Sequence, residues 1–258
     1  EKFGEDQAKG FRFYLRRMTV LALFGFLHLF FLWYGDILLT YAVAGLLLML
    51  FYRRKVKTIL IWMGLFLSLF TGLMLLNVLL LRSVSPEELA LFQEMGERKL
   101  HEALTVYQKA PLLEWLSWRF THEVVPYLEN MFFAVLPVLF MFLIGFLAAK
   151  FGYVQRAHAH LPLLKKVIFF GIVLSLPFEA VILLTHFGHL DFGLLTTYVQ
   201  QVMASISGIF LSLVYIAFLL RLLHHGKWAR RLKPIGNVGR MALSNYIGQT
   251  LVGVGLYT

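Results

Sequence analysis

Residues 25–45 read GFLHLFFLWYGDILLTYAVAG, a stretch in which a Gly-Asp pair separates two apolar runs. The runs extend outward to residues 18–34 and 37–52. Each approaches the roughly 17–25 residues that a helix needs to cross about 30 Å of hydrocarbon. Gly35-Asp36 favours a turn between them. The sequence therefore predicts a membrane-embedded helical hairpin with an aspartate at its turn.

The composition places the whole chain in the same class. The 258 residues are 59% hydrophobic and 15% charged, whereas a soluble domain is about 45–50% apolar and about 25% charged. The mean hydropathy is +0.74. The chain contains no cysteine, which excludes disulfides, thiol catalysis, iron–sulfur clusters and Cys-ligated zinc.

Five further apolar runs predict five more membrane spans, at residues 58–81, 131–149, 164–185, 196–223 and 238–258. The expected fold is all-α, a polytopic transmembrane helix bundle of about seven spans that forms one domain over residues 1–258. The chain begins with Glu and stops inside an apolar run. We therefore expect it to be a fragment of a larger bundle.

The basic residues lie mainly in connections on one side of the predicted spans. Of the 24 Lys and Arg residues, 19 occur there. They are Lys2, Lys9, Arg12, Arg16, Arg17, Arg53, Arg54, Lys55, Lys57, Lys150, Arg156, Lys165, Lys166, Arg221, Lys227, Arg230, Arg231, Lys233 and Arg240. The positive-inside rule makes this side cytoplasmic. The net charge of +10 then reflects topology and contact with anionic lipids rather than nucleic-acid binding. A multi-pass protein of a bacterial inner membrane is expected.

The polar insert at residues 82–130 falls on the opposite, extracytoplasmic side. Ser85 and Glu88 have the spacing of a capping box, and apolar residues then recur at helical spacing. Trp115 and Trp118 are typical of an interfacial belt. The insert is predicted to be an amphipathic helical cap.

Ionisable and amide side chains within the spans gather at one level in the outer leaflet. His28 and Glu179 each lie about six residues from the outer end of a span, a depth of roughly 9 Å. Asn77 and Gln201 lie at a similar level in their own spans. Because such residues are costly in a bilayer, they are candidates for a functional site. An outward-opening pocket beneath the cap is the simplest arrangement.

Each candidate also has a structural explanation. His28 could serve merely to hydrogen-bond a neighbouring helix. The turn at Gly35-Asp36 explains in part why an aspartate occurs at position 36. Asn245 and Gln249 share a face of the last span, where such residues often hold helices together. Arg119, with its neighbours His122 and Glu123, could belong to a solvated face of the cap. Glu179 is harder to explain in this way, since a carboxylate at that depth must be paired or protonated.

Patterns for metals and nucleotides are weak. His186-x-x-His189-x-Asp191 and His158-x-His160 lack the helical spacing of an HExxH site, and no metal is predicted. The sequence contains no Walker A loop, GxSxG elbow or GxGxxG fingerprint.

The first hairpin resembles the YeiB-like bacterial membrane proteins, which contain the domain of unknown function 418. The matching features are Arg16-Arg17, the Gly25-x-x-His28 pair, Gly35-Asp36-Ile37-Leu38 and Tyr41-Ala42. The stretch GRMALSNYIGQT at residues 239–250 is similar to the second hallmark of this family. The resemblance implies further helices before the first span and more sequence after the last.

The family is also similar, at the superfamily level, to integral-membrane acyltransferases that pass acyl groups to extracytoplasmic acceptors. The resemblance implies acyl transfer, with acyl-CoA or another acyl donor and a small-molecule, glycan or lipid acceptor. His28 would be the general base, and Asp36 or Glu179 would orient it. The expected substrate-binding residues are Arg119, Asn77, Gln201, Asn245 and Gln249.

Two other functions stay open from the residues alone. A small-solute transporter or exporter would use Glu179 as its coupling carboxylate, although no inverted repeat is visible in the sequence. A non-catalytic scaffold or sensor would use the cap as a partner surface. The sequence does not indicate an oligomeric state.

Overall fold

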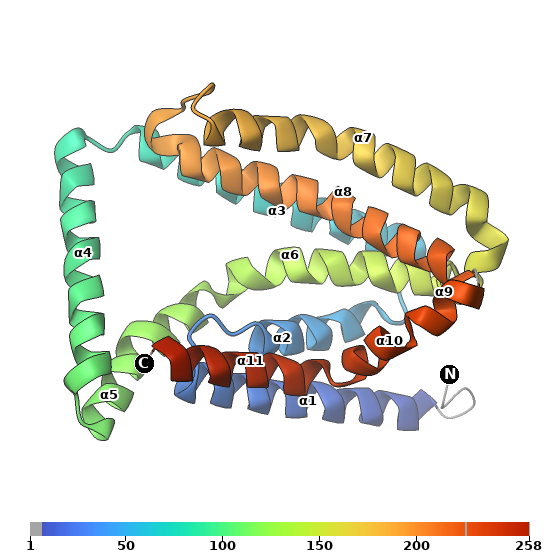
Figure 1. The fold of residues 1–258 in the computed structure, drawn as a ribbon, viewed down its shortest axis with the longest axis horizontal. Coiled ribbons are helices and arrows are strands. Elements are labelled where there is room, and N and C mark those ends of the chain that lie inside the picture. Colours follow the sequence, from blue (N-terminus) through green and yellow to red (C-terminus); the bar gives the residue numbers. More distant parts are fainter. Residues whose placement is uncertain (1–6, 225, 258) are drawn as a thin grey trace. The chain divides into compact units, whose positions relative to one another are not determined.

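The computed structural model describes residues 7–224 and 226–257, and these are helical apart from short connections. Figure 1 shows the order of the helices along the chain. The chain divides into two compact units. Unit 1 comprises Glu1–Phe70, Val84–Leu143 and Met241–Thr258, and unit 2 comprises Thr71–Ser83 and Ile144–Arg240. Because no strand occurs among the described residues, the all-α prediction is confirmed.

The predicted hairpin is present in unit 1. Helix α1 (Gln7–Phe31) packs along α2 (Leu38–Leu48), which a 3-10 turn, η1 (Met49–Phe51), extends. The helices meet closely at Gly25, where an added Cβ would lie 2.4 Å from the Leu39 nitrogen. Any larger residue would force them apart. Gly35 and Asp36 lie in the non-helical turn between the helices, as expected.

Among the residues that the structure describes, five helical segments are long and apolar enough to cross a membrane. These are Ala8–Phe31, Val56–Leu80, Leu112–Lys150, Ala157–His186 and Thr196–His224. The other two predicted spans are also helices, but short ones: Leu38–Phe51 and α11 (Ala242–Tyr257), which has 16 residues. The chain is therefore a multi-pass helical membrane protein.

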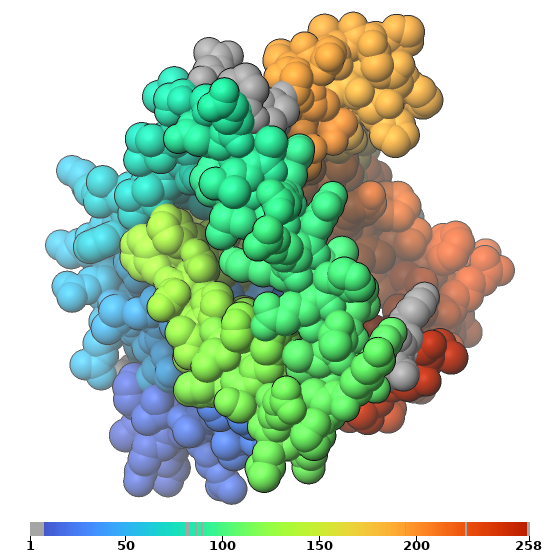
Figure 2. Space-filling view, turned by 90° about the vertical axis from the view of Figure 1, so that its left-hand side faces the viewer, coloured from blue at the N-terminus to red at the C-terminus, as the bar shows by residue number. Residues whose placement is uncertain are grey.

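The insert contains two helices, α4 (Pro86–Lys109) and α5 (Leu112–Arg119). The capping box of α4 is confirmed, since Ser85 and Glu88 exchange hydrogen bonds between side chain and backbone. Figure 2 shows the side chains of α4, in green, on the surface of the molecule. The apolar residues Phe92 and Leu100 of this helix are 59% and 62% exposed.

The fourth predicted span begins earlier in the structure than the sequence indicated. A π-helical turn, η2 (Phe120–Val124), joins α5 directly to α6 (Val125–Lys150). The π turn ends two residues before Pro126, which has no N–H for an α-helical bond to residue 122. The second half of the insert is thus continuous with the spanning helix.

Unit 2 is built on the pair α7 (Leu161–His186) and α8 (Thr196–His224), which lie side by side (Figure 1). Gly171 permits their close approach, because an added Cβ would lie 2.5 Å from the Val214 Cγ2. The 3-10 turns η3 (Ala157–His160) and η4 (Gly193–Leu195) precede these helices. Two short helices, α9 (Gly226–Arg231) and α10 (Lys233–Arg240), follow α8.

Helix α3 (Val56–Arg82) is shared between the units. Helix α11 returns to unit 1, where it runs beside α1 and the turn after it (Figure 1).

Candidate functional site

A buried dyad of His28 and Asp36 lies at the turn of the hairpin. The Nδ1 of His28 is 3.0 Å from the Oδ1 of Asp36. Only 2% of His28 and 3% of Asp36 are exposed. The two residues come together because α1 ends three residues beyond His28 and the turn brings Asp36 back beside the ring.

The other nitrogen of the ring faces helix α11. The Nε2 of His28 is 3.0 Å from the Oγ1 of Thr250, and the Tyr246 ring lies 4.9 Å from the imidazole between centroids. Thr250 and Tyr246 are one helical turn apart and therefore share a face. The result is a line of carboxylate, imidazole and hydroxyl that draws on three separate segments of unit 1.

Asp36 is fixed by more than His28. Its Oδ2 accepts a hydrogen bond from the Leu39 N–H at 2.7 Å, and this bond satisfies one of the free donors at the start of α2. Its backbone carbonyl accepts a hydrogen bond from the Tyr127 hydroxyl at 2.8 Å. Burial raises the pKa of the Asp36 carboxyl, while the Leu39 N–H acts in the opposite direction. The turn alone explains the capping bond but not the contact with His28.

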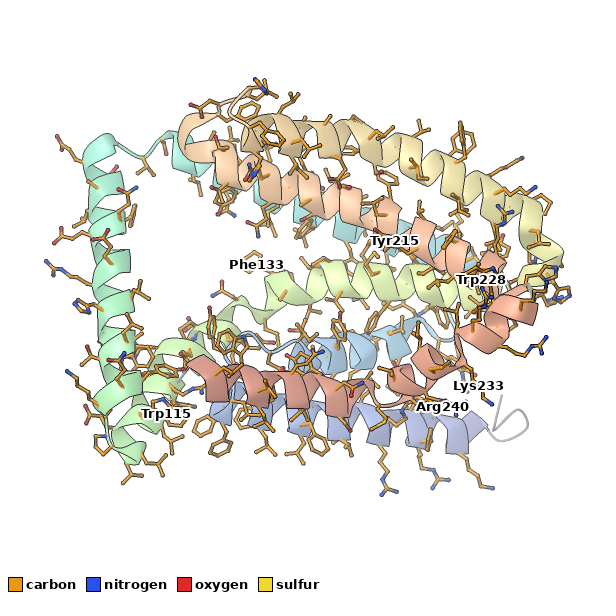
Figure 3. All side chains as sticks on the ribbon, in the orientation of Figure 1. Trp115, Phe133, Tyr215, Trp228, Lys233 and Arg240 are labelled. Atoms are coloured by element: carbon orange, nitrogen blue, oxygen red, sulfur yellow. The ribbon has the colours of Figure 1, made fainter. Side chains whose placement is uncertain are left out.

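Arg119 supports the same end of α1 from the side of α5. Its guanidinium is fully buried and donates to the carbonyls of Leu29 at 2.9 Å and Leu32 at 3.3 Å. Its Nε is 2.9 Å from the Oε2 of Glu123. The guanidinium carbon also lies 5.0 Å from the centroid of the Trp115 ring, and Figure 3 labels this tryptophan on α5.

The other carboxylate oxygen of Glu123 links this group to α4. Tyr107 donates its hydroxyl to the Oε1 of Glu123 at 2.7 Å. Burial, and then this hydrogen bond, raise the pKa of the Tyr107 hydroxyl. The interpretation of these residues as a solvated face is therefore wrong for Arg119 and Glu123, because the fold buries them against α1 and α4. It holds for His122, which is exposed.

The in-span carboxylate Glu179 lies in unit 2. It accepts a hydrogen bond from the hydroxyl of Ser207, a fully buried residue of α8. Six residues further along α7, Thr185 accepts a hydrogen bond from the Gln200 amide at 3.0 Å. The predicted residue Gln201 is exposed. Glu179 thus has a hydrogen-bond partner on the neighbouring helix.

The other predicted substrate-binding residues are spread over both units. Asn77 is exposed, and its amide donates to the Leu73 carbonyl of its own helix at 3.0 Å. In α11, Gln249 is exposed and Asn245 is partly buried. The sequence did not single out Thr250, Tyr246 or Tyr127 as site residues.

Metal binding finds no support in the described part of the chain, which contains no group of three or more His, Asp or Glu residues suited to hold an ion.

The arrangement can move a proton between a hydroxyl and the imidazole. The Thr250 hydroxyl also donates to the Tyr246 carbonyl of its own helix at 3.2 Å. With the ring proton on Nδ1, which faces Asp36 as an ion pair, the Nε2 is left as an acceptor. The Nε2 then faces a hydroxyl, as in general base catalysis, and the carboxylate would stabilise the imidazolium that forms.

Comparison with known proteins identifies the family. Residues 148–258 match the family model described as "Protein of unknown function (DUF418)". This part of the chain thus carries the sequence pattern of the DUF418 family. The resemblance to YeiB-like proteins is thereby confirmed, and the DUF418 match includes α7, α8 and α11.

Two bacterial relatives extend the similarity over most of the sequence. The chain is 30% identical to the "Uncharacterized protein YxaH" of Bacillus subtilis (strain 168), over 96% of the chain and 62% of that protein. It is 29% identical to the "Uncharacterized 39.9 kDa protein in amylase 3'region" of Bacillus acidopullulyticus, over 92% of the chain and 54% of that protein. The chain thus spans little more than half the length of these relatives. No solved structure matches it.

Proposed function

We propose that the chain is the core of an acyltransferase-like protein of a bacterial plasma membrane, which modifies a hydroxyl of an extracytoplasmic glycan or lipid. The observation that carries the proposal is the line of Asp36, His28 and Thr250. In it, a buried imidazole contacts a carboxylate through Nδ1 and a hydroxyl through Nε2, both at 3.0 Å. A histidine that only joined two helices would not need a buried carboxylate on its second nitrogen.

In the proposed reaction, His28 acts as the general base. The acceptor oxygen forms a bond to the acyl carbon of a thioester donor, and the acceptor proton passes to Nε2. The carbon–sulfur bond breaks, and the imidazolium returns the proton to the departing thiolate. Asp36 keeps Nδ1 protonated and stabilises the charge on the ring. No cofactor is required in this scheme beyond the acyl donor, for which acyl-CoA is the proposed form.

Access to the dyad requires movement of α11. Because His28 and Asp36 are almost fully buried, an acceptor hydroxyl can reach Nε2 only where Thr250 now lies. We propose that Thr250 occupies the acceptor position in the resting state. The positive-inside rule places this end of the hairpin on the extracytoplasmic side, where such an acceptor would be found.

The test is transfer of a radiolabelled acetyl group from acetyl-CoA to lipids and glycans, in membranes from cells that produce the full-length protein. His28→Ala is expected to reduce the specific transfer by at least about a hundredfold, the usual contribution of a general base. His101→Ala is the matched control, since His101 is exposed on α4. Equal transfer by the two variants would refute the role of His28.

One observation favours a second candidate, a small-solute transporter. Glu179 is an ionisable residue within a predicted span and bonds to a buried serine of the neighbouring helix, a pairing that protonation of the carboxylate would change. Proton-coupled flux in proteoliposomes that is lost in Glu179→Gln and kept in His28→Ala would favour transport over acyl transfer.

A further inference from the structure

A cavity of about 350 Å³ lies in unit 2, where α7 begins and α8 ends. Leu161, Pro162 and Lys165 line it from α7, and Arg221 and His224 line it from α8. Its volume is at the lower end of the range for small-molecule sites, about 300–1,000 Å³. It lies at the basic ends of these helices, whereas Glu179 and Gln200 lie toward their other ends.

The charge around this cavity is positive and has no acidic counterpart in the neighbouring sequence. Residues 144–178 and 192–240 contain neither Asp nor Glu. These segments therefore supply no carboxylate to balance Lys165 and Arg221. Two cations that converge on one cavity, while the carboxylate of their helices, Glu179, lies toward the other end of α7, favour an anionic ligand.

The helix dipoles explain one of these cations and not the other. Arg221 and His224 lie in the last turn of α8, where the partial negative charge favours basic side chains. Lys165 is the fifth residue of α7, near the partial positive charge at the start of that helix. The helix dipole does not favour a cation at this end of α7, whereas it would favour a bound anion.

The surroundings of the cavity are typical of a membrane surface. Trp228 lies just beyond the end of α8 (Figure 3) and is 41% exposed. The Arg231 guanidinium lies over its ring at 5.3 Å. Exposed tryptophans and arginines are frequent at the level of lipid headgroups. Leu161 and Pro162 supply an apolar wall beside the cations.

We propose that this cavity binds a phosphate group, which Lys165 and Arg221 hold at the start of α7. The phosphate belongs either to the headgroup of an anionic lipid or to a soluble phosphorylated ligand. The two share the same recognition chemistry, a doubly contacted phosphate beside an apolar wall. This inference does not depend on acyl transfer.

The test uses the full-length protein in nanodiscs of phosphatidylcholine doped with increasing amounts of phosphatidylglycerol, with thermal unfolding as the readout. The wild type should gain stability in a saturable manner. The double variant Lys165→Gln/Arg221→Gln should need at least about tenfold more phosphatidylglycerol, because it lacks both charged hydrogen-bond donors to the phosphate. The control, Lys166→Gln/Arg230→Gln, removes the same charge from two exposed residues that do not line the cavity.

A second arm identifies the source of the phosphate. In discs of phosphatidylcholine alone, inorganic pyrophosphate should stabilise the wild type if the ligand is soluble, and should have no effect if the site needs a headgroup. The proposal would be overturned if both double variants lost the same amount of phosphatidylglycerol-dependent stabilisation. It would also be overturned if phosphatidylglycerol stabilised the wild type no more than phosphatidylcholine does and pyrophosphate had no effect. Should the double variant not fold, Lys165→Gln against Lys166→Gln gives the same comparison.

Discussion

Replacement of Arg119 by methionine gives the sharpest test of the packing around the dyad. Arg119 and Arg98 each pair with a glutamate four residues away on the same helix, but in opposite surroundings. The side chains of Arg119 and Glu123 are 0% and 12% exposed. Those of Arg98 and Glu94 are 78% and 57% exposed. The two pairs therefore form a matched comparison of one interaction in a buried and an exposed site.

The expected loss for Arg119→Met follows from the contacts that it removes. Two backbone carbonyls at the end of α1 lose their donor, and Glu123 keeps a largely buried charge without its partner. Breaking a buried pair from one side costs about 3–5 kcal/mol. Arg98→Met should cost about 0–1 kcal/mol, as is typical of an exposed pair.

The assay is unfolding by sodium dodecyl sulfate in mixed detergent micelles, followed by circular dichroism. The double variant Arg119→Met/Glu123→Gln should lose less than the sum of its single losses, because the second change removes the stranded charge while a side-chain oxygen is kept for Tyr107. If Arg119→Met unfolded within about 1 kcal/mol of Arg98→Met, the account of a buried anchor at the end of α1 would be refuted.

The remaining predictions concern the dyad, the hairpin and the cap. Thr250→Ala should retain acyl transfer in the membrane assay, since the acceptor is proposed to replace this hydroxyl, and a loss that Thr250→Ser restores would instead make Thr250 a participant. Gly25→Ala should destabilise the protein by about 1–3 kcal/mol in the detergent assay, the usual cost of overpacking, whereas Gly64→Ala meets no atom within 4 Å and should not. The hydrogen bonds from Ser85 lower the pKa of Glu88. The capping box is therefore complete above the ordinary pKa of glutamate and is lost as the pH falls through the lowered value, which amide exchange in the first turn of α4 should detect.

The membrane class and the helical elements follow from the sequence because they depend on properties of single segments. Apolar length predicts a spanning helix, and residue pairs such as Gly35-Asp36 and Ser85/Glu88 predict turns and caps through local hydrogen bonds. Dependence on single-segment properties also explains why the predicted start of the fourth span, residue 131, lies later than the start of the helical segment at Leu112. The sequence between residues 112 and 130 contains polar side chains, which lower its hydropathy. Hydropathy does not indicate that the backbone there continues the helix through a π turn.

The site could be predicted only in part, because its decisive contacts join distant segments. His28 stood out as an ionisable residue in an apolar run, and Asp36 stood out at the turn. Thr250 did not, because a threonine in an apolar helix is ordinary and costs little. On α11 the sequence favours Asn245 and Gln249 as site residues because they are the more polar pair. Tyr246 and Thr250 have the same spacing and occupy the adjacent face. Which face of a helix meets the histidine is decided by packing over more than two hundred residues of sequence separation.

The same distinction explains why the sequence favours a solvated position for Arg119 on the cap, whereas the fold buries it. A charged residue beside Trp and Glu on an amphipathic helix is expected to be exposed. Only the fold shows that the Arg119 guanidinium donates to backbone carbonyls at the end of α1. Yet those carbonyls belong to Leu29 and Leu32, on either side of the point where α1 gives way to the turn that carries Asp36. By fixing the end of α1, Arg119 also fixes where His28 and Asp36 meet. We therefore propose that Arg119 is a positioning residue, and loss of Arg119 should disturb the dyad as well as the stability of unit 1.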